Sequence, residues 1–180
     1  MRSRLVAMSA LALLAAAAVV ISWSGSGTAQ TARHEIPQSF VVAHQDTLAE
    51  LTAIGKRHTR TGLIARQAIA AVKKHFEREE EYILPPLTLA PAIANGHVSP
   101  DMKWAIAMAD RIKADRETIF TEHTVITEWM NELAAAAERS HEADVIAFAR
   151  GAVADSLNDT EVNEPMAIVI GEYLRAKLGP

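Results

Sequence analysis

Residues 75–87 read His-Phe-Glu-Arg-Glu-Glu-Glu-Tyr-Ile-Leu-Pro-Pro-Leu and predict a helix that carries polar groups on its buried face. His75 and Glu79 are four residues apart, so they lie on the same side of a helix. Their side of the helix continues in both directions at alternating steps of four and three, through Ala68, Val72 and Tyr82. Such spacing is typical of a seam that faces neighbouring helices. We therefore expect a histidine and a glutamate inside the fold.

The same spacing recurs in the second half of the chain. Each half has a lone histidine, then 31 or 32 residues later a polar pair four residues apart, then a proline ten residues after the first member of the pair. The positions are His44, His75, Glu79 and Pro85 in the first half, and His123, Asp155, Asp159 and Pro165 in the second. A proline inside a helix costs about 3 kcal/mol unless the bend is used. The repeat therefore predicts two equivalent helical hairpins.

The rest of the chain also has helical character, with Ala, Leu, Glu and Lys at helical spacing and few breaks. The breaks fall near residues 55–62 and 95–100 and around Ser140. Four helices result, at about residues 37–54, 63–93, 100–137 and 141–178. Short connections between them favour an antiparallel, up-down four-helix bundle. We predict an all-α domain over residues 37–180.

Residues 1–29 have the layout of an export signal, followed by a linker at residues 30–36. Two arginines within residues 1–4 precede 18 uncharged residues, 5–22, and small residues occupy positions 27–29. Eighteen residues are also just long enough to span a bilayer, so an uncleaved membrane anchor is the alternative. The domain is expected to be periplasmic or secreted, or anchored and facing the extracytoplasmic side. Contact with a membrane is expected only if this segment stays uncleaved.

Composition excludes several classes of function. The chain has 180 residues, 49% of them hydrophobic, which suits one globular domain. The net charge is -4 and no basic run is present, so nucleic acid is not expected as a partner. No cysteine is present, which excludes disulfides, thiolate metal sites and thiol nucleophiles. Any chemistry must come from histidine, carboxylate and hydroxyl groups.

The other three predicted helices also carry polar residues in apolar stripes. The stripes are Phe40, Val41, His44, Leu48 and Leu51 on the first helix, Ile119, Phe120, His123, Ile126 and Met130 on the third, and Phe148, Ala152, Asp155, Asp159, Val162, Met166 and Tyr173 on the last. Three imidazoles and three carboxylates would then point inward, with no Lys or Arg on these seams near the middle of the helices. Buried carboxylates need compensation. Metal ions held between helices would supply it.

These residues resemble the hemerythrin-like, HHE-type cation-binding domain. The resemblance rests on the His44-Gln-Asp-Thr-Leu-Ala-Glu-Leu segment, on the His-Phe-x-x-Glu-Glu step that begins at His75, and on the proline that follows. It implies a four-helix bundle that holds a non-haem di-iron centre with histidines and bridging carboxylates. It further implies iron ligands at His44, His75, Glu79 and His123, with Glu79 bridging the metals.

The second half departs from the family pattern. The family usually repeats a His-x-x-x-Glu step where this chain has Asp155 and Asp159, so one histidine is missing. Aspartate is shorter and replaces a neutral nitrogen with a charged oxygen, which favours harder ions. We include both aspartates as candidate ligands. A mononuclear site, or another divalent metal, is the alternative to two irons. Three further carboxylates are expected to be solvated surface charge: Glu80, Glu81 and Glu161.

The resemblance implies an iron-binding protein that binds dioxygen or a similar small ligand such as nitric oxide, or that handles iron or redox equivalents. The layout of residues 1–29 adds the expectation that it is exported. No substrate pocket can be inferred from the sequence, so a binding role is favoured over an enzymatic one. An iron centre can also carry out oxidase or peroxidase-like chemistry. The alternative is a degenerate, metal-free helical bundle that acts as an extracytoplasmic binding or structural module.

Overall fold

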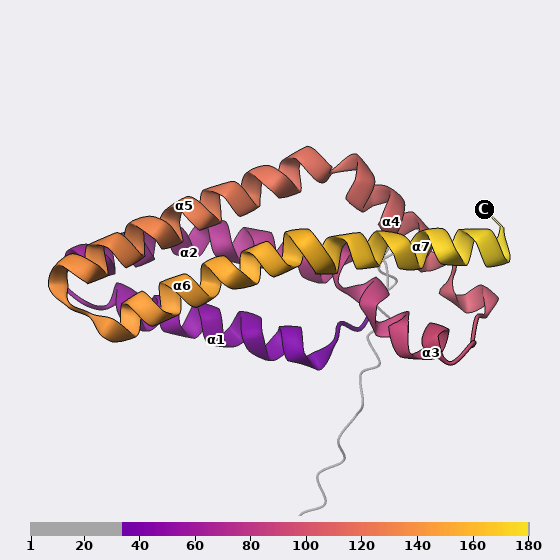
Figure 1. The fold of residues 1–180 in the computed structure, drawn as a ribbon, viewed down its shortest axis with the longest axis horizontal. Coiled ribbons are helices and arrows are strands. Elements are labelled where there is room, and N and C mark those ends of the chain that lie inside the picture. The colour runs from indigo at the N-terminus through magenta and orange to yellow at the C-terminus, as the bar shows by residue number, and fades with distance from the viewer. Residues whose placement is uncertain (1–33, 180) are drawn as a thin grey trace, which may run out of the picture. The chain divides into compact units, whose positions relative to one another are not determined.

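The computed structural model describes residues 34–179, and this part of the chain is all-helical, with no β-strand (Figure 1). The all-α prediction is confirmed for these residues. The predicted signal or anchor at residues 1–29, and residues 30–33 of the predicted linker, lie outside the described range. Within that range, no helix is both long enough and apolar enough to cross a membrane.

The longer helices are α1 (Gln38–Gly55), α2 (Arg60–Arg78), α4 (Trp104–Ala114), α5 (Arg116–Ser140), α6 (Ala143–Asn158) and α7 (Glu164–Leu178). The shorter elements are the π-helical turns η1 (Glu79–Ile83) and η4 (Asp159–Asn163), the 3-10 turns η2 (Pro85–Leu89) and η3 (Pro100–Met102), and the short helix α3 (Ala90–Ala94). The predicted helix at residues 100–137 is broken at Asp115, between α4 and α5. The predicted helix at residues 63–93 is divided into α2, η1, η2 and α3.

Local sequence explains where the central helices start and stop. Thr59 caps α2, because its hydroxyl accepts a hydrogen bond from the backbone N–H of Gly62 at 3.2 Å. His141 ends α5 in the left-handed conformation, with φ of 58°. Both breaks lie where the sequence predicted them. The connections are short, so α1 and α2, and likewise α5 and α6, are adjacent helical pairs.

Each proline of the repeat follows a π-helical turn at the same distance. The backbone N–H of Leu84 donates to the Glu79 carbonyl at 2.8 Å, and the N–H of Glu164 donates to the Asp159 carbonyl. In each case a proline comes next, at Pro85 or Pro165, and supplies no N–H of its own. The two halves thus share a backbone irregularity as well as a residue spacing. π-helical turns of this kind are frequent at functional sites.

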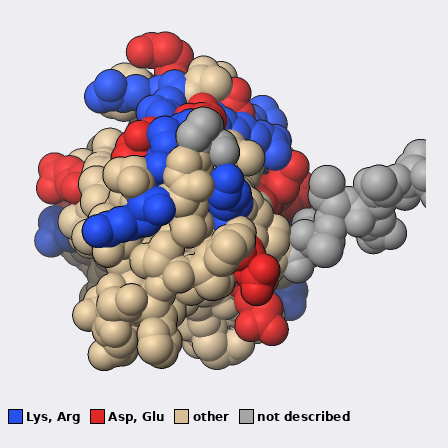
Figure 2. Space-filling model, turned by 90° about the vertical axis from the view of Figure 1, so that its right-hand side faces the viewer, with Lys and Arg blue, Asp and Glu red and all other residues tan. Residues whose placement is uncertain are grey.

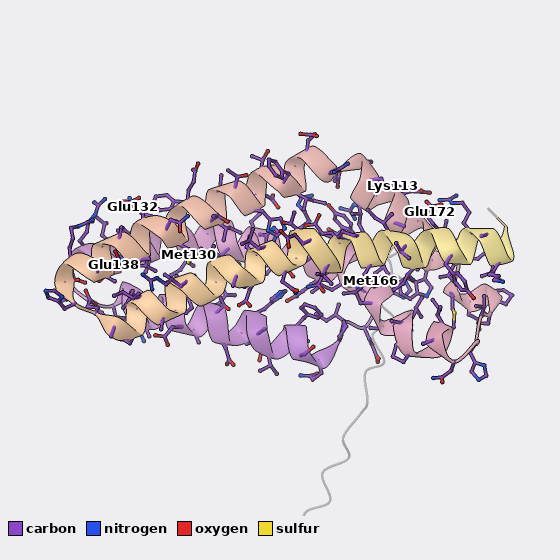
Figure 3. All side chains as sticks on the ribbon, in the orientation of Figure 1. Lys113, Met130, Glu132, Glu138, Met166 and Glu172 are labelled. Atoms are coloured by element: carbon purple, nitrogen blue, oxygen red, sulfur yellow. The ribbon has the colours of Figure 1, made fainter. Side chains whose placement is uncertain are left out.

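Two groups of helices pack together. Helix α2 contacts α1 and α5, and α6 contacts α5 and α1. Helix α4 packs along α7, and ion pairs join them: Lys113 lies 2.5 Å from Glu172 and Arg175 lies 2.6 Å from Asp110 (Figure 3). At the end of the domain seen in Figure 2, charged side chains gather mainly in the upper part of the view and much of the lower part is uncharged. Residues 82–100 contain no charged side chain.

A polar layer separates the apolar clusters along the helices. One cluster is built from α1, α2, α5 and α6, and two others from the segments around η1, α4 and α7. Where the chain passes from the first cluster toward the others, the buried residues become polar: His75 and Glu79 follow Val72, His123 precedes Ile126, and Ser156 follows Ala149. The candidate functional groups lie in this layer.

Candidate metal centre

Three histidines and one glutamate from three helical segments lie buried in the polar layer. The predicted seam on α2 and η1 is confirmed, because all five of its members are buried: Ala68, Val72, His75, Glu79 and Tyr82. His44 on α1 and His123 on α5 are buried as well. Four of the six candidate ligands therefore come from the interior of the fold.

Glu79 lies between two imidazole rings. Its Oε2 is 3.2 Å from His44 Nε2, and its Oε1 is 3.3 Å from His75 Nε2. The angles are not those of hydrogen bonds: both oxygens of Glu79 and Nε2 of His75 lack a hydrogen-bond partner among the described residues. Leaving a buried polar group unpaired costs about 1–3 kcal/mol, and more for a charged one. Glu79 is only 1% exposed, so water does not offset this cost.

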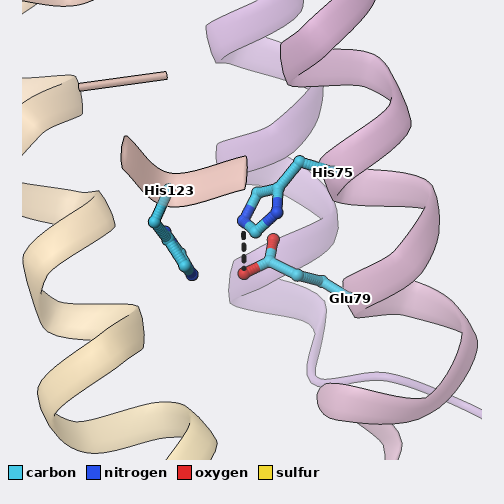
Figure 4. A group of neighbouring side chains, drawn as sticks. All are labelled: His75, Glu79 and His123. Atoms are coloured by element: carbon cyan, nitrogen blue, oxygen red, sulfur yellow. Dashed lines mark ion pairs between the residues drawn. The ribbon is translucent and has the colours of Figure 1, made fainter. Parts of the chain in front are cut away.

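His123 completes a group of three possible ligands. Its ring lies edge-on to that of His75, with centroids 4.3 Å apart (Figure 4). One ligand atom each from His75, Glu79 and His123 lies within 4.8 Å of the others. The nitrogen and carboxylate donors of this group suit Fe, Mn or Zn.

Each histidine is also held from its outer side. His44 Nδ1 lies 3.0 Å from Glu80 Oε1, His75 Nδ1 lies 3.4 Å from Glu122 Oε2, and His123 Nδ1 lies 2.8 Å from Ser156 Oγ. A carboxylate or other acceptor on one ring nitrogen fixes the tautomer that leaves the other nitrogen free to bind a metal. Glu80 is therefore part of the site, and its assignment to solvated surface charge is wrong.

Glu122 is itself fixed by Arg78, whose Nε and Nη2 donate to its two oxygens at 2.9 and 3.2 Å. Its negative charge next to His75 is thereby kept in place. Glu122 and Ser156 are residues that the sequence reasoning missed. Glu122 is 47 residues from His75 in the sequence, and Ser156 is 33 residues from His123. Tertiary packing brings each pair together, so no local spacing in the sequence indicates these contacts.

The charges in the site perturb its pKa values. Burial would raise the pKa of Glu79, but its contacts with His44 and His75 lower it to about 2. Burial disfavours the charged form of His44, yet Glu79 and Glu80 outweigh it and raise the pKa of that imidazole. The pKa of His75 is raised in the same way, by Glu79 and Glu122 against burial. Without a metal, the carboxylate is ionised and attracts protons to the rings beside it.

The two aspartates of the second half differ in position. Asp159 is half-buried and accepts a hydrogen bond from Asn163 Nδ2 at 2.6 Å. Burial, together with the negative charge of Glu79, raises the pKa of Asp159 to about 6. Asp155 is exposed, so the prediction that it points inward is wrong. It lines pockets beside the cluster from their outer side.

The error for Asp155 has a structural cause. Helix α6 buries Val145, Ala149 and Ser156, a face turned by about one residue from the predicted one. The π-helical turn η4 follows α6. The same one-residue offset continues beyond this turn, and three further members of the predicted seam are exposed: Val162, Met166 and Tyr173. In their place, Ala167, Ile170 and Leu174 are buried.

Glu164 is a site residue that the sequence reasoning did not identify. It begins α7, and its Oε1 lies 2.7 Å from His123 Nε2. Its side chain is 12% exposed. The missed signal is Pro165, because the irregular turn before this proline brings a residue five positions after Asp159, rather than four, toward the interior.

A small cavity adjoins the cluster. Its volume is about 40 Å³. Five apolar residues line it, Val72, Phe76, Ile126, Met130 and Ala152, together with the polar residues Thr47, His75, Asp155, Ser156 and Asp159. A space of this size holds one or two water-sized molecules.

Comparison of the chain with protein-family models, with curated proteins and with solved structures finds no match.

Proposed function

We propose that the chain is a hemerythrin-like four-helix bundle that holds iron through His44, His75, Glu79 and His123. The mutual contacts of α1, α2, α5 and α6, and the repeated π-helical turn, support the bundle. One observation carries the metal site: the buried Glu79 carboxylate faces imidazole nitrogens without a hydrogen bond to either oxygen.

The spacing of these atoms fits ligands of one ion or of two adjacent ions. Neighbouring ligands of an octahedral ion lie about 3.0 Å apart when its bonds are about 2.1 Å long. The Glu79 oxygens lie 3.2 and 3.3 Å from the two imidazole nitrogens. Because each oxygen faces a different histidine, Glu79 has the position of a bridging carboxylate, which supports a di-iron centre. A mononuclear centre uses the same residues.

The donor set suits several divalent metals and does not by itself select iron. The choice of iron, and of a diatomic ligand, therefore rests on the sequence resemblance. Bound iron would supply an open coordination position for dioxygen or nitric oxide. The chain contributes the cavity of about 40 Å³ beside His75, which has room for a diatomic molecule. Export from the cytoplasm is likewise part of the proposal, and it rests on the sequence of residues 1–29.

The experiment is anaerobic reconstitution of the full chain with Fe²⁺, followed by metal analysis and by absorption spectra before and after addition of nitric oxide or dioxygen. We expect one or two irons per chain and a new charge-transfer band on addition of the gas. His75→Ala should lose both. His58→Ala, which removes an exposed histidine, should keep both.

Two other outcomes separate the alternatives. No bound metal in the wild-type chain would contradict the proposal and favour a metal-free bundle with a binding or structural role. Equal iron binding by the wild type and His75→Ala would place the metal elsewhere.

Metal binding is expected to release protons and to weaken as the pH falls. A histidine must be neutral to bind a metal. The pKa values of His44 and His75 are raised in the metal-free protein, so both rings keep their protons to a higher pH than free histidine does. Asp159, with a pKa of about 6, holds a further proton in slightly acidic solution. Affinity should therefore fall by about 10-fold or more per pH unit as the pH drops through these values.

Calorimetric titration with Mn²⁺ at about pH 6 and about pH 8, in buffers with different heats of protonation, measures both the affinity and the protons released. An affinity that stays constant over this range would contradict binding through His44 and His75.

A further inference from the structure

Glu164 and His123 are in close contact at the inner end of α7. The Glu164 carboxylate lies 2.7 Å from His123 Nε2, while the other ring nitrogen of His123 is engaged by Ser156 at 2.8 Å. His123 therefore has a fixed orientation, with Ser156 on its outer side and Glu164 at its remaining nitrogen. Both side chains are largely buried, at 6% and 12% exposure.

The contact resembles the arrangement around Glu79, except that Glu164 and His123 form a hydrogen bond, which Glu79 and His75 do not. There, a carboxylate oxygen lies 3.3 Å from Nε2 of His75, whose Nδ1 faces an outer carboxylate. Around His123, a carboxylate oxygen lies beside Nε2, and Nδ1 faces an outer hydroxyl. Both pairs have about the separation of neighbouring ligands on one ion.

The carboxylate charges of Glu79 and Glu164 also favour a bound cation. With neutral imidazoles, Glu79 and Glu164 give this part of the site a charge of about -2, which a single divalent cation cancels. No buried Lys or Arg is present among the described residues to do so. Both oxygens of the nine-tenths buried Glu79 lack a hydrogen-bond partner among the described residues, whereas Glu164 is hydrogen-bonded to His123.

The backbone explains why Glu164 can take this position. The turn η4 closes with a hydrogen bond from the N–H of Glu164 to the Asp159 carbonyl, five residues back. The extra residue in this turn brings Glu164 toward α5 while Asp155 stays at the surface. The second half thus supplies an inward carboxylate at a position outside the repeated spacing.

We propose that Glu164 is a ligand of the metal centre and replaces the donor that the exposed Asp155 does not provide. This inference rests on the proposed metal-binding function. It adds Glu164, through its 2.7 Å contact with His123, to the group of His75, Glu79 and His123 as a further carboxylate donor for a divalent cation such as Fe²⁺ or Mn²⁺.

The test compares Glu164→Gln with Glu161→Gln, which changes an exposed glutamate on the same turn. Titration of the full chain with Co²⁺ reports affinity and, through its visible absorption, the ligand set. We expect Glu164→Gln to bind Co²⁺ about 10–100-fold more weakly, with an altered spectrum, and Glu161→Gln to match the wild type. If the glutamine variant does not fold, Glu164→Asp replaces it in the test. Because this variant keeps the charge, we expect a smaller loss of Co²⁺ affinity.

A double-variant cycle with His123→Ala separates a ligand from a residue that only orients His123. A ligand lowers affinity further in the His123→Ala background, whereas an orienting residue has no additional effect there. If the wild type binds Co²⁺ and Glu164→Gln binds it with the same affinity and spectrum, the inference about Glu164 is overturned while the proposed function stands. Absence of Co²⁺ binding by the wild type would overturn the proposed function together with it.

Discussion

Replacement of Glu79 by glutamine is expected to weaken metal binding by more than about 100-fold. The substitution keeps the size of the side chain but removes the charge that lies between His44 and His75. Residues that only orient ligands typically contribute 10–100-fold to metal affinity, so loss of a central carboxylate should exceed that range. Metal analysis after reconstitution, with competition titration to obtain the affinity, measures the effect.

Glu77→Gln is the matched control. Glu77 lies two residues before Glu79, in the last turn of α2, is exposed and pairs only loosely with Lys73 at 3.9 Å. Its replacement should leave metal affinity within about 2-fold of the wild type. Full metal occupancy in the Glu79 variant, at affinity close to that of the wild type, would mean that the buried cluster is a charge-paired element of a metal-free fold.

Replacement of Gly62 by alanine is expected to destabilise the domain by about 3 kcal/mol. A Cβ atom at this position would lie 2.0 Å from the backbone oxygen of Arg57 and 3.1 Å from that of Ile54. Both neighbours are backbone atoms, so relief of the clash requires movement of the α1–α2 connection. For a domain of this size the melting temperature should fall by about 6–12 °C, which calorimetry or thermal circular dichroism measures.

Gly151→Ala is the opposite control. Gly151 lies within α6, is exposed, and a Cβ atom there meets nothing within 4 Å. Alanine favours the helix over glycine, so this variant should be more stable by about 0.5–1 kcal/mol. Equal stability of the two variants would show that the connection before α2 adapts freely to a side chain.

The interior of the first half could be predicted from sequence because it follows regular helical geometry. The spacing from Ala68 to Tyr82 places every member on one buried face, and the structure buries all of them. The same holds for α5, the first helix of the second half: Ile119, His123, Ile126 and Met130 are buried as predicted, and only Phe120 is exposed, at 61%. Here side-chain direction depends on local periodicity, which the sequence contains.

The last two helices, α6 and α7, were predicted less well, because their buried face lies one residue from the predicted seam. This offset is already present in α6, at Ala149 and Ser156, and it continues past η4 to Ala167 and Leu174. Pro165 indicated the irregular turn η4 but not which face of α6 and α7 is buried. The outer partners Glu122 and Ser156 depend on contacts between distant segments, so no local pattern could identify them.

The polar layer has a consequence for how the domain opens. It interrupts the apolar interior. The apolar cluster between α1, α2, α5 and α6 is therefore separate from the apolar clusters around α4 and α7. Regions joined by charged groups rather than by continuous packing can unfold as separate cooperative units. A cation held at the boundary would tie those units into one, and its loss would leave each end of the molecule to fluctuate on its own.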